Sequence, residues 1–176
     1  MKKVLGVMRL HAIYTACVAL LLMIIFSCTT RYVTPSEYGD LNATNRVLIA
    51  ATSTDFKDAV IEKVSKKLAG DDTYVKVIDL KAVDHEESGK FCAIMLVSTL
   101  HYGYIDGNVS AFLSKSNTEE KSKIIVFTTS GEPDWKVENQ EVDAISSASH
   151  SKNISPIANQ VVEKIRLKCM LTPVSQ

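Results

Sequence analysis

FCAIMLVSTLHYGYIDGNVSAFL, residues 91–113, is predicted to form a strand, a loop and a helix in succession. Phe91–Val97 is a run of seven apolar residues, typical of a strand that is buried on both faces of a parallel sheet. A polar and aromatic loop follows at residues 98–103, and apolar residues then recur at helical spacing (Ile105, Val109, Phe112 and Leu113). Ligands of open α/β sheets bind at the carboxyl ends of strands, near a switch in strand order. The loop is therefore either part of a ligand site or an ordinary turn.

Four further segments resemble strands. Arg46–Ala51 and Lys123–Thr128 are almost entirely apolar after their first residue, which favours buried positions, whereas Tyr74–Leu80 alternates more and favours an edge. The last strand is expected at Val142–Ser147. Strands that alternate with helices predict a parallel sheet covered by helices on both faces.

Two of the intervening helices have clear sequence patterns. The helix after the first strand has apolar positions at Val60, Ile61, Val64 and Leu68 and ends near Gly70, with Lys57 expected on the opposite, solvated face. The final helix is predicted to have Ser155 as its cap and Pro156 at its first position. Residues 81–90 are charged and predict at most a short helix.

The N-terminus has the features of an export signal. Lys2, Lys3 and Arg9 precede a 15-residue apolar run, Ala12–Phe26, which is shorter than the roughly 20 residues of a spanning helix. The run ends in Ile25-Phe26-Ser27-Cys28, which resembles a bacterial lipobox apart from Phe26. This resemblance implies cleavage before Cys28 and lipidation of its thiol; the alternative is an uncleaved signal anchor.

These patterns divide the chain into four parts. They predict a lipoprotein signal peptide at residues 1–27, a polar tether at 28–45, one α/β domain at 46–170 and a short tail at 171–176. The expected location is the bacterial cell envelope, with the domain held at a membrane by the lipid and facing the periplasm or the exterior.

Charge and cysteine content exclude some functions. The chain has 20 basic and 20 acidic residues; three of the basic ones lie in the signal, so the mature chain has a net charge of −3 and shows no basic, aromatic-rich patch for nucleic acid. Cys92 and Cys169 lack the spacing of metal ligands, and no metal is expected. They are interpreted as two buried thiols, with a disulfide between them as the less favoured alternative.

The domain resembles the flavodoxin family over nearly all of residues 46–168. Residues 47–57 lie where flavodoxins carry the phosphate loop S/T-x-T-G-x-T, and residues 97–103, VSTLHYG, resemble the second loop, GSPxYYG. The continuation IDGNVSAFL is similar to the menaquinone-dependent protoporphyrinogen oxidase branch. The resemblance implies a flavodoxin-like open parallel five-stranded sheet of order 2-1-3-4-5, with FMN at its carboxyl edge.

The resemblance also implies a set of flavin-binding residues. The first loop contributes Thr52, Ser53, Thr54 and Lys57, the second contributes Ser98, Thr99, Leu100, His101, Tyr102 and Gly103, and the third contributes Thr129, Ser130, Gly131 and Trp135. Tyr102 would lie against the isoalloxazine ring, Gly103 would allow close backbone approach, and Trp135 would either stack on the ring or cover the core. His101 is either a solvated loop residue or a proton donor. His150 follows the last strand and could face the site, but it is assigned no role.

The phosphate loop departs from the family pattern at three positions. Asp55 replaces the glycine, Phe56 a polar residue and Lys57 the last threonine. Asp55 would repel a phosphate, whereas Lys57 could offset that charge as a point-charge partner. The alternative is that Asp55 caps the helix, because a carboxylate cap and a phosphate compete for the same N–H groups.

The sequence therefore predicts a lipid-anchored flavodoxin-like protein that binds FMN and acts in electron transfer with a redox protein or a quinone. Two alternatives stay open. One is a flavin-free binding or structural lipoprotein on the same fold, since fold alone does not fix function. The other is a quinone- or nitro-reducing flavoenzyme, which would need a hydride donor outside the cytosol.

Overall fold

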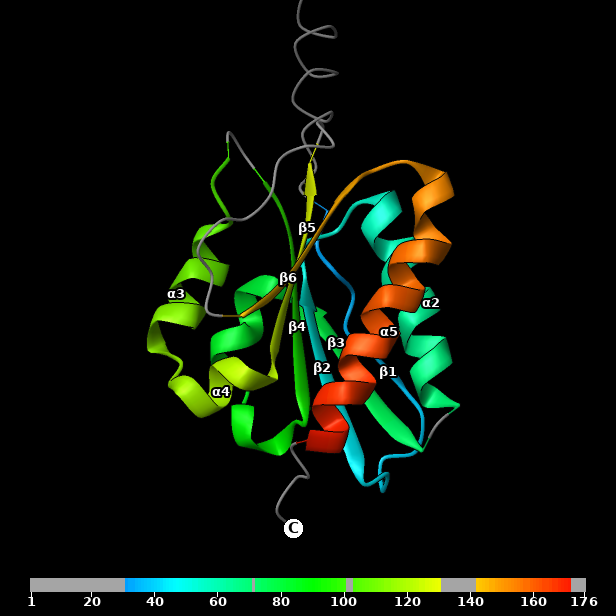
Figure 1. Cartoon of the computed structure of the whole chain (residues 1–176), viewed down its shortest axis with the longest axis vertical. Coiled ribbons are helices and arrows are strands. Elements are labelled where there is room, and N and C mark those ends of the chain that lie inside the picture. The colour runs from blue at the N-terminus through cyan, green and yellow to red at the C-terminus, as the bar shows by residue number, and fades with distance from the viewer. Residues whose placement is uncertain (1–30, 71, 101–102, 131–141, 172–176) are drawn as a thin grey trace, which may run out of the picture. The chain divides into compact units, whose positions relative to one another are not determined.

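A computed structural model describes residues 31–70, 72–100, 103–130 and 142–171, and the chain from Tyr32 onward forms one compact unit. A six-stranded sheet has the order β1-β3-β2-β4-β5-β6 (Figure 1). The strands are β1 (Ser36–Tyr38), β2 (Asn45–Ala51), β3 (Thr73–Asp79), β4 (Ala93–Thr99), β5 (Ile124–Ser130) and β6 (Asp143–Ala148). The α-helices are α2 (Asp55–Ala69), α3 (Gly107–Lys115), α4 (Thr118–Lys123) and α5 (Ile154–Leu171). Three short 3-10 helices are η1 (Leu80–His85), η2 (Ser88–Lys90) and η3 (Ser151–Asn153).

Helices cover both faces of the sheet, with α2 and α5 on one side and α3 and α4 on the other (Figure 1). Side chains alternate along each strand, so β4 presents Met95 and Val97 to the α2–α5 layer and Ile94 and Leu96 to the α3 layer. All four of these side chains are fully buried. The prediction of a central strand in this run is thus confirmed, but β4 starts two residues later than predicted, at Ala93, and includes Ser98 and Thr99, which were predicted to lie in the loop.

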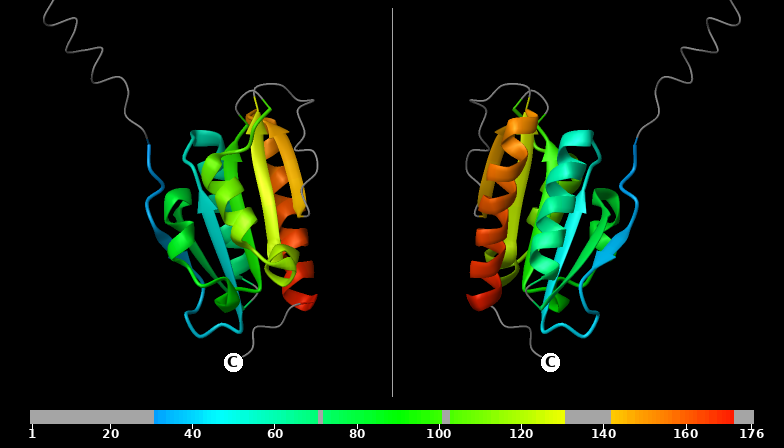
Figure 2. Two further views of the ribbon diagram at one scale, coloured as in Figure 1. Left: turned by 90° about the vertical axis from the view of Figure 1, so that its left-hand side faces the viewer. Right: turned by 90° about the vertical axis from the view of Figure 1, so that its right-hand side faces the viewer.

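The five parallel strands keep the expected order. Read without β1, the sheet is β3-β2-β4-β5-β6, which is 2-1-3-4-5, and Figure 2 shows these strands side by side. The chain moves from β2 through α2 to β3 on one side, then crosses back to β4 on the other side of β2. The carboxyl ends of β2 and β4 therefore flank the switch point where ligands of such sheets bind.

A sixth strand lies where a tether was predicted. Ser36 pairs with Val77 in the antiparallel β1–β3 ladder, and the N–H of Val33 donates to Asp79 Oδ2 at 3.1 Å. β3 is therefore not the edge strand, and the sheet includes residues that precede Arg46. A three-residue strand is too short to produce a detectable period, which is why the sequence pattern missed it.

The ends of some elements also differ from the predictions. α5 begins at Ile154, directly after η3, so Ser155 and Pro156 lie within its first turn rather than at its cap. β6 runs one residue later than expected. Such shifts are ordinary at the ends of elements.

Cys92 and Cys169 form a disulfide, with an S–S distance of 1.98 Å and a Cα–Cα distance of 4.7 Å. The prediction of two separate thiols was wrong. Cys92 immediately precedes β4 at the amino edge of the sheet, and α5 runs antiparallel to the strands and brings Cys169 back to that edge. Because 77 residues separate the two cysteines, their spacing in the sequence gave no sign of this pairing.

Candidate functional site

Lys57 is a buried cation at the switch point. Its side chain is 1% exposed, and its Nζ donates to Thr52 Oγ1 and, at 3.0 Å, to Thr99 Oγ1. The prediction that Lys57 lies on the solvated face of its helix was wrong. Lys57 lies in the first turn of α2, and its side chain extends to the carboxyl ends of β2 and β4. There its ammonium group forms hydrogen bonds with threonine hydroxyls instead of water.

Three threonines form the surroundings of this ammonium. Thr52 directly follows β2. Thr99 is the last residue of β4, and Thr129, which is next to the last residue of β5, is its partner in the β4–β5 ladder. Thr99 Oγ1 is 3.4 Å from Thr129 Oγ1, so the hydroxyls continue from one strand end to the next. The result is a polar cluster with a positive charge within an otherwise apolar layer.

Burial lowers the pKa of Lys57 from 10.5 to about 8, while the carboxylates of Asp58 and Asp106 act in the opposite direction. Hydroxyl groups solvate an ammonium less well than water does, so the charged form is disfavoured. An anion beside Nζ would stabilise the charged form and raise this pKa. The position is therefore chemically suited to an anionic group.

Thr54 is the cap of α2. Its Oγ1 accepts the N–H of Lys57 at 3.3 Å, so the alternative in which Asp55 caps the helix was wrong. This hydroxyl was predicted to contact phosphate, but it already satisfies one of the N–H groups at the helix start. An anion at this helix start would meet fewer unused backbone donors than a glycine-containing phosphate loop provides.

A cavity of about 510 Å³ opens at the carboxyl edge, within the size range of small-molecule sites. It is lined by Thr54, Asp55, Phe56, Thr99, Thr129, Ser130, Ala148, Ser149 and His150. Four of these, Thr54, Thr99, Thr129 and Ser130, were predicted to bind cofactor. The chain segment after β6 contributes Ser149 and His150, which the sequence pattern left without a role although they directly follow a strand end.

Other predicted residues lie away from this cavity. Ser53 Oγ donates to Asp58 Oδ2 at 2.7 Å, and both residues line a separate cavity beside β1. Ser98 is fully buried, and its Oγ has no hydrogen-bond partner among the described residues. Leu100 is buried, and its N–H donates to Thr129 O at 2.8 Å, which extends the pairing of β4 with β5.

Gly103 has a φ of +82°, and a Cβ there would meet no atom within 4 Å. Within the described residues the glycine is required by its backbone conformation, not by close approach of the chain. The predicted residues His101, Tyr102, Gly131 and Trp135, and the predicted lipidation site Cys28, lie outside the described residues.

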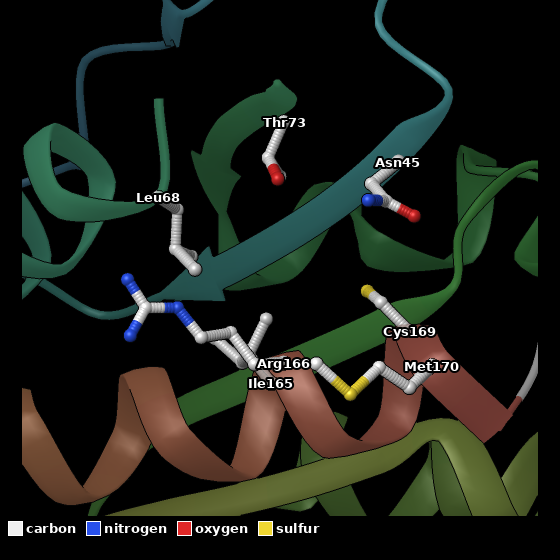
Figure 3. Close-up of a pocket in the computed structure, with 7 residues that line it drawn as sticks. All are labelled: Asn45, Leu68, Thr73, Ile165, Arg166, Cys169 and Met170. Atoms are coloured by element: carbon white, nitrogen blue, oxygen red, sulfur yellow. The ribbon is translucent and has the colours of Figure 1, made fainter. Parts of the chain in front are cut away.

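Another cavity, of about 410 Å³, lies at the opposite, amino edge of the sheet (Figure 3). It is lined by Asn45, Leu68, Thr73, Ile165, Arg166, Cys169 and Met170. Leu68, Ile165 and Met170 make much of its wall apolar, and the disulfide at Cys169 fixes one side of it. It therefore offers less for polar recognition than the Lys57 cluster does.

The described residues contain no cluster of three or more histidine, cysteine or acidic side chains that could hold a metal ion. None of the helices in the described ranges has both the length and the apolar character needed to cross a bilayer.

The sequence matches no family model and no curated protein. Solved structures do match the fold. A flavodoxin from the domain Archaea is 14% identical, with 70% of this chain and 98% of that chain covered and a TM-score of 0.51. Oxidised Flavodoxin 2 from Bacillus cereus is 17% identical, with 70% and 99% covered and a TM-score of 0.52. An oxidoreductase from Corynebacterium diphtheriae is 10% identical, with 74% and 97% covered and a TM-score of 0.51. The chain therefore has a flavodoxin-like fold.

Proposed function

We propose that this chain is a membrane-anchored, flavodoxin-like protein that binds FMN at the carboxyl edge and acts in electron transfer. The observation that carries the proposal is the buried Lys57 ammonium, held by Thr52 and Thr99 at the switch point. Fold alone does not assign a ligand, so the argument depends on the chemistry of this cluster.

The residues present fit an anionic head group held by a cation and hydroxyls. Lys57 does not line the cavity, but its Nζ lies directly behind Thr99, which does, and would supply the positive charge from there. Thr99, Thr129 and Ser130 line the cavity and would supply the hydroxyls. Asp55 lines the same cavity and would repel the anion. We therefore expect weaker phosphate binding than a glycine-containing loop with free backbone N–H groups would give.

Bound FMN would supply the redox chemistry through its isoalloxazine ring, while the protein orients the flavin and tunes it. Lys57, which is already mostly protonated at pH 7, would offset part of the phosphate charge, and the bound phosphate would raise its pKa. A flavin-free binding protein on the same fold is the competing function, and the titration below separates the two.

FMN and riboflavin differ by the phosphate, which makes them a matched pair of probes. We expect the chain from Thr29 onward to bind FMN about tenfold to hundredfold more tightly than riboflavin, since a charge-assisted contact is worth about 1.5–3 kcal/mol. Lys57→Met should remove most of this preference, whereas Asp55→Asn should strengthen FMN binding by removing the repulsion. Quenching of flavin fluorescence measures each dissociation constant. Equal affinities for the two flavins in the wild type would refute the assigned role of Lys57.

Two observations support location in the cell envelope. The disulfide between Cys92 and Cys169 is of a kind that persists in oxidising compartments. The basic and apolar N-terminus that ends at Cys28 has the pattern of an exported lipoprotein. Cys28→Ala should move the protein from the membrane fraction to a soluble or uncleaved form. A wild-type mature N-terminus other than Cys28 would refute the lipid anchor.

A further inference from the structure

The domain is attached to its N-terminal segment at the carboxyl edge, where the candidate site lies. Val33 donates to Asp79, the last residue of β3, so the chain enters the domain at that edge before β1 runs toward the amino edge. Four residues lie between Cys28 and Val33, so five Cα–Cα steps join them. A fully extended chain of that length spans at most about 18 Å.

This reach is short compared with the domain. β3 extends from Thr73 to Asp79, and its six steps of ~3.3 Å separate the two edges of the sheet by ~20 Å, to which the loops at the amino edge add. If Cys28 is fixed at a bilayer surface, the link is too short for the amino edge to face that surface. On that premise, the short link would keep the carboxyl edge nearer to the surface than the amino edge.

Two tyrosines and a lysine exposed at the carboxyl edge suit an interface with lipid, and Asp55 is exposed at the same edge. Tyr32 and Tyr104 are 63% and 77% exposed, and Lys81 Nζ lies 5.0 Å from the centroid of the Tyr32 ring. Tyr104 belongs to the segment between β4 and α3, so it is at the same edge as Tyr32. Tyrosine and lysine are residues that bury an apolar part at a membrane interface and keep a polar end in water.

We propose that the partner of the carboxyl edge is the lipid bilayer surface, and that the cavity lined by Thr99 and Thr129 opens toward it. Molecules that exchange with this site would then arrive from the membrane surface, which favours a bilayer-dissolved partner over a bulky soluble protein. The inference rests on the proposed lipid anchor and on the proposed use of the site, but its geometry does not depend on flavin.

Energy transfer from the protein to an acceptor lipid tests the orientation. The full lipoprotein is reconstituted in phosphatidylcholine–phosphatidylglycerol vesicles with a donor dye at one of two exposed positions. Lys152→Cys places the dye in η3 at the carboxyl edge, and Leu41→Cys places it in the loop between β1 and β2 at the amino edge. Vesicles without the acceptor lipid provide the reference.

We expect transfer from position 152 to be about twofold or more higher than from position 41, because the two edges lie ~20 Å apart. Equal transfer, or higher transfer from position 41, would overturn the proposal. A 20-residue Gly-Ser insertion between Arg31 and Tyr32 extends the average reach by about 25 Å and should reduce the difference. If the insertion variant keeps the same difference in energy transfer between positions 152 and 41, the short link is not what orients the domain.

The outcomes separate this inference from the function. The transfer measurement needs no flavin, so an orientation as expected together with failed flavin titrations would refute only the FMN proposal. FMN binding together with equal transfer at both positions would refute only the membrane-facing edge. Absence of the protein from the vesicles would refute the anchor and, with it, the orientation.

Discussion

Replacing Lys57 with methionine tests whether the ammonium is buried at a cost in stability. Methionine has a similar length and no charge, so it should occupy the same space between α2 and the sheet. The pKa of Lys57 is about 8 in the folded chain and is expected near 10.5 when the chain is unfolded. Between these two values the unfolded chain binds more protons than the folded chain.

This difference fixes the sign of the pH dependence. Stability rises with pH wherever the unfolded state binds more protons, so the cost of the charge is present below pH 8 and disappears toward pH 10.5. From pH 7 to pH 10 the wild type should gain about 2.5 kcal/mol relative to Lys57→Met. Comparison of the two proteins cancels tyrosines such as Tyr74, whose pKa burial raises to about 12.

Urea unfolding at several pH values, followed by circular dichroism, measures the effect. We expect Lys57→Met to be the more stable protein at pH 7 and to lose most of that advantage by pH 10. Added FMN should reduce the pH dependence of the wild type, because a bound anion raises the pKa of Lys57. If the free energies of unfolding of the two proteins without ligand change with pH in the same way, the argument that Lys57 is a buried charge is refuted.

Three further changes test the fold around the site. Replacing Cys92 and Cys169 together with alanine should lower the free energy of unfolding by about 4.5 kcal/mol, the loop-closure value for a link across 77 residues, and unchanged urea midpoints would contradict this. Thr54→Ala should cost about 1 kcal/mol through loss of the α2 cap, whereas Thr54→Ser should cost little; equal losses in the two variants would mean that the hydroxyl is not the cause. Met95→Asp should prevent folding because it buries an unpaired carboxylate in β4, with Met95→Leu as the conservative control, and a folded aspartate variant by circular dichroism would show that β4 is not central.

The central strands could be predicted from the sequence because a strand that is buried on both faces is apolar along its length. Their order was implied by the resemblance to flavodoxins, and the structure adds β1 at one edge. The seven successive apolar residues at 91–97 favour a parallel strand that is buried on both faces. The loop that follows β4 and the helical spacing of Val109 and Phe112 then fixed the position of α3. β1 was missed because its three residues gain their structure from pairing with β3, not from a pattern of their own.

The candidate site was predicted in location but not in arrangement. Lys57 was assigned to the solvated face because lysines seldom lie in cores, and the hydroxyls that solvate it come from Thr52 and Thr99, the second of them 42 residues away. His150 enters the cavity from the far end of β6, which a local motif cannot show. The disulfide was missed for the same reason, since its pairing depends on how α5 returns along the sheet.

The most direct test of the flavin proposal is the absorbance of the purified chain from Thr29 onward after saturation with FMN and gel filtration. We predict flavin bands that elute with the protein, and loss of most of this flavin in Lys57→Met. A colourless wild-type protein, and no binding in a titration up to millimolar FMN, would contradict the account and leave a flavin-free binding protein on a flavodoxin-like fold.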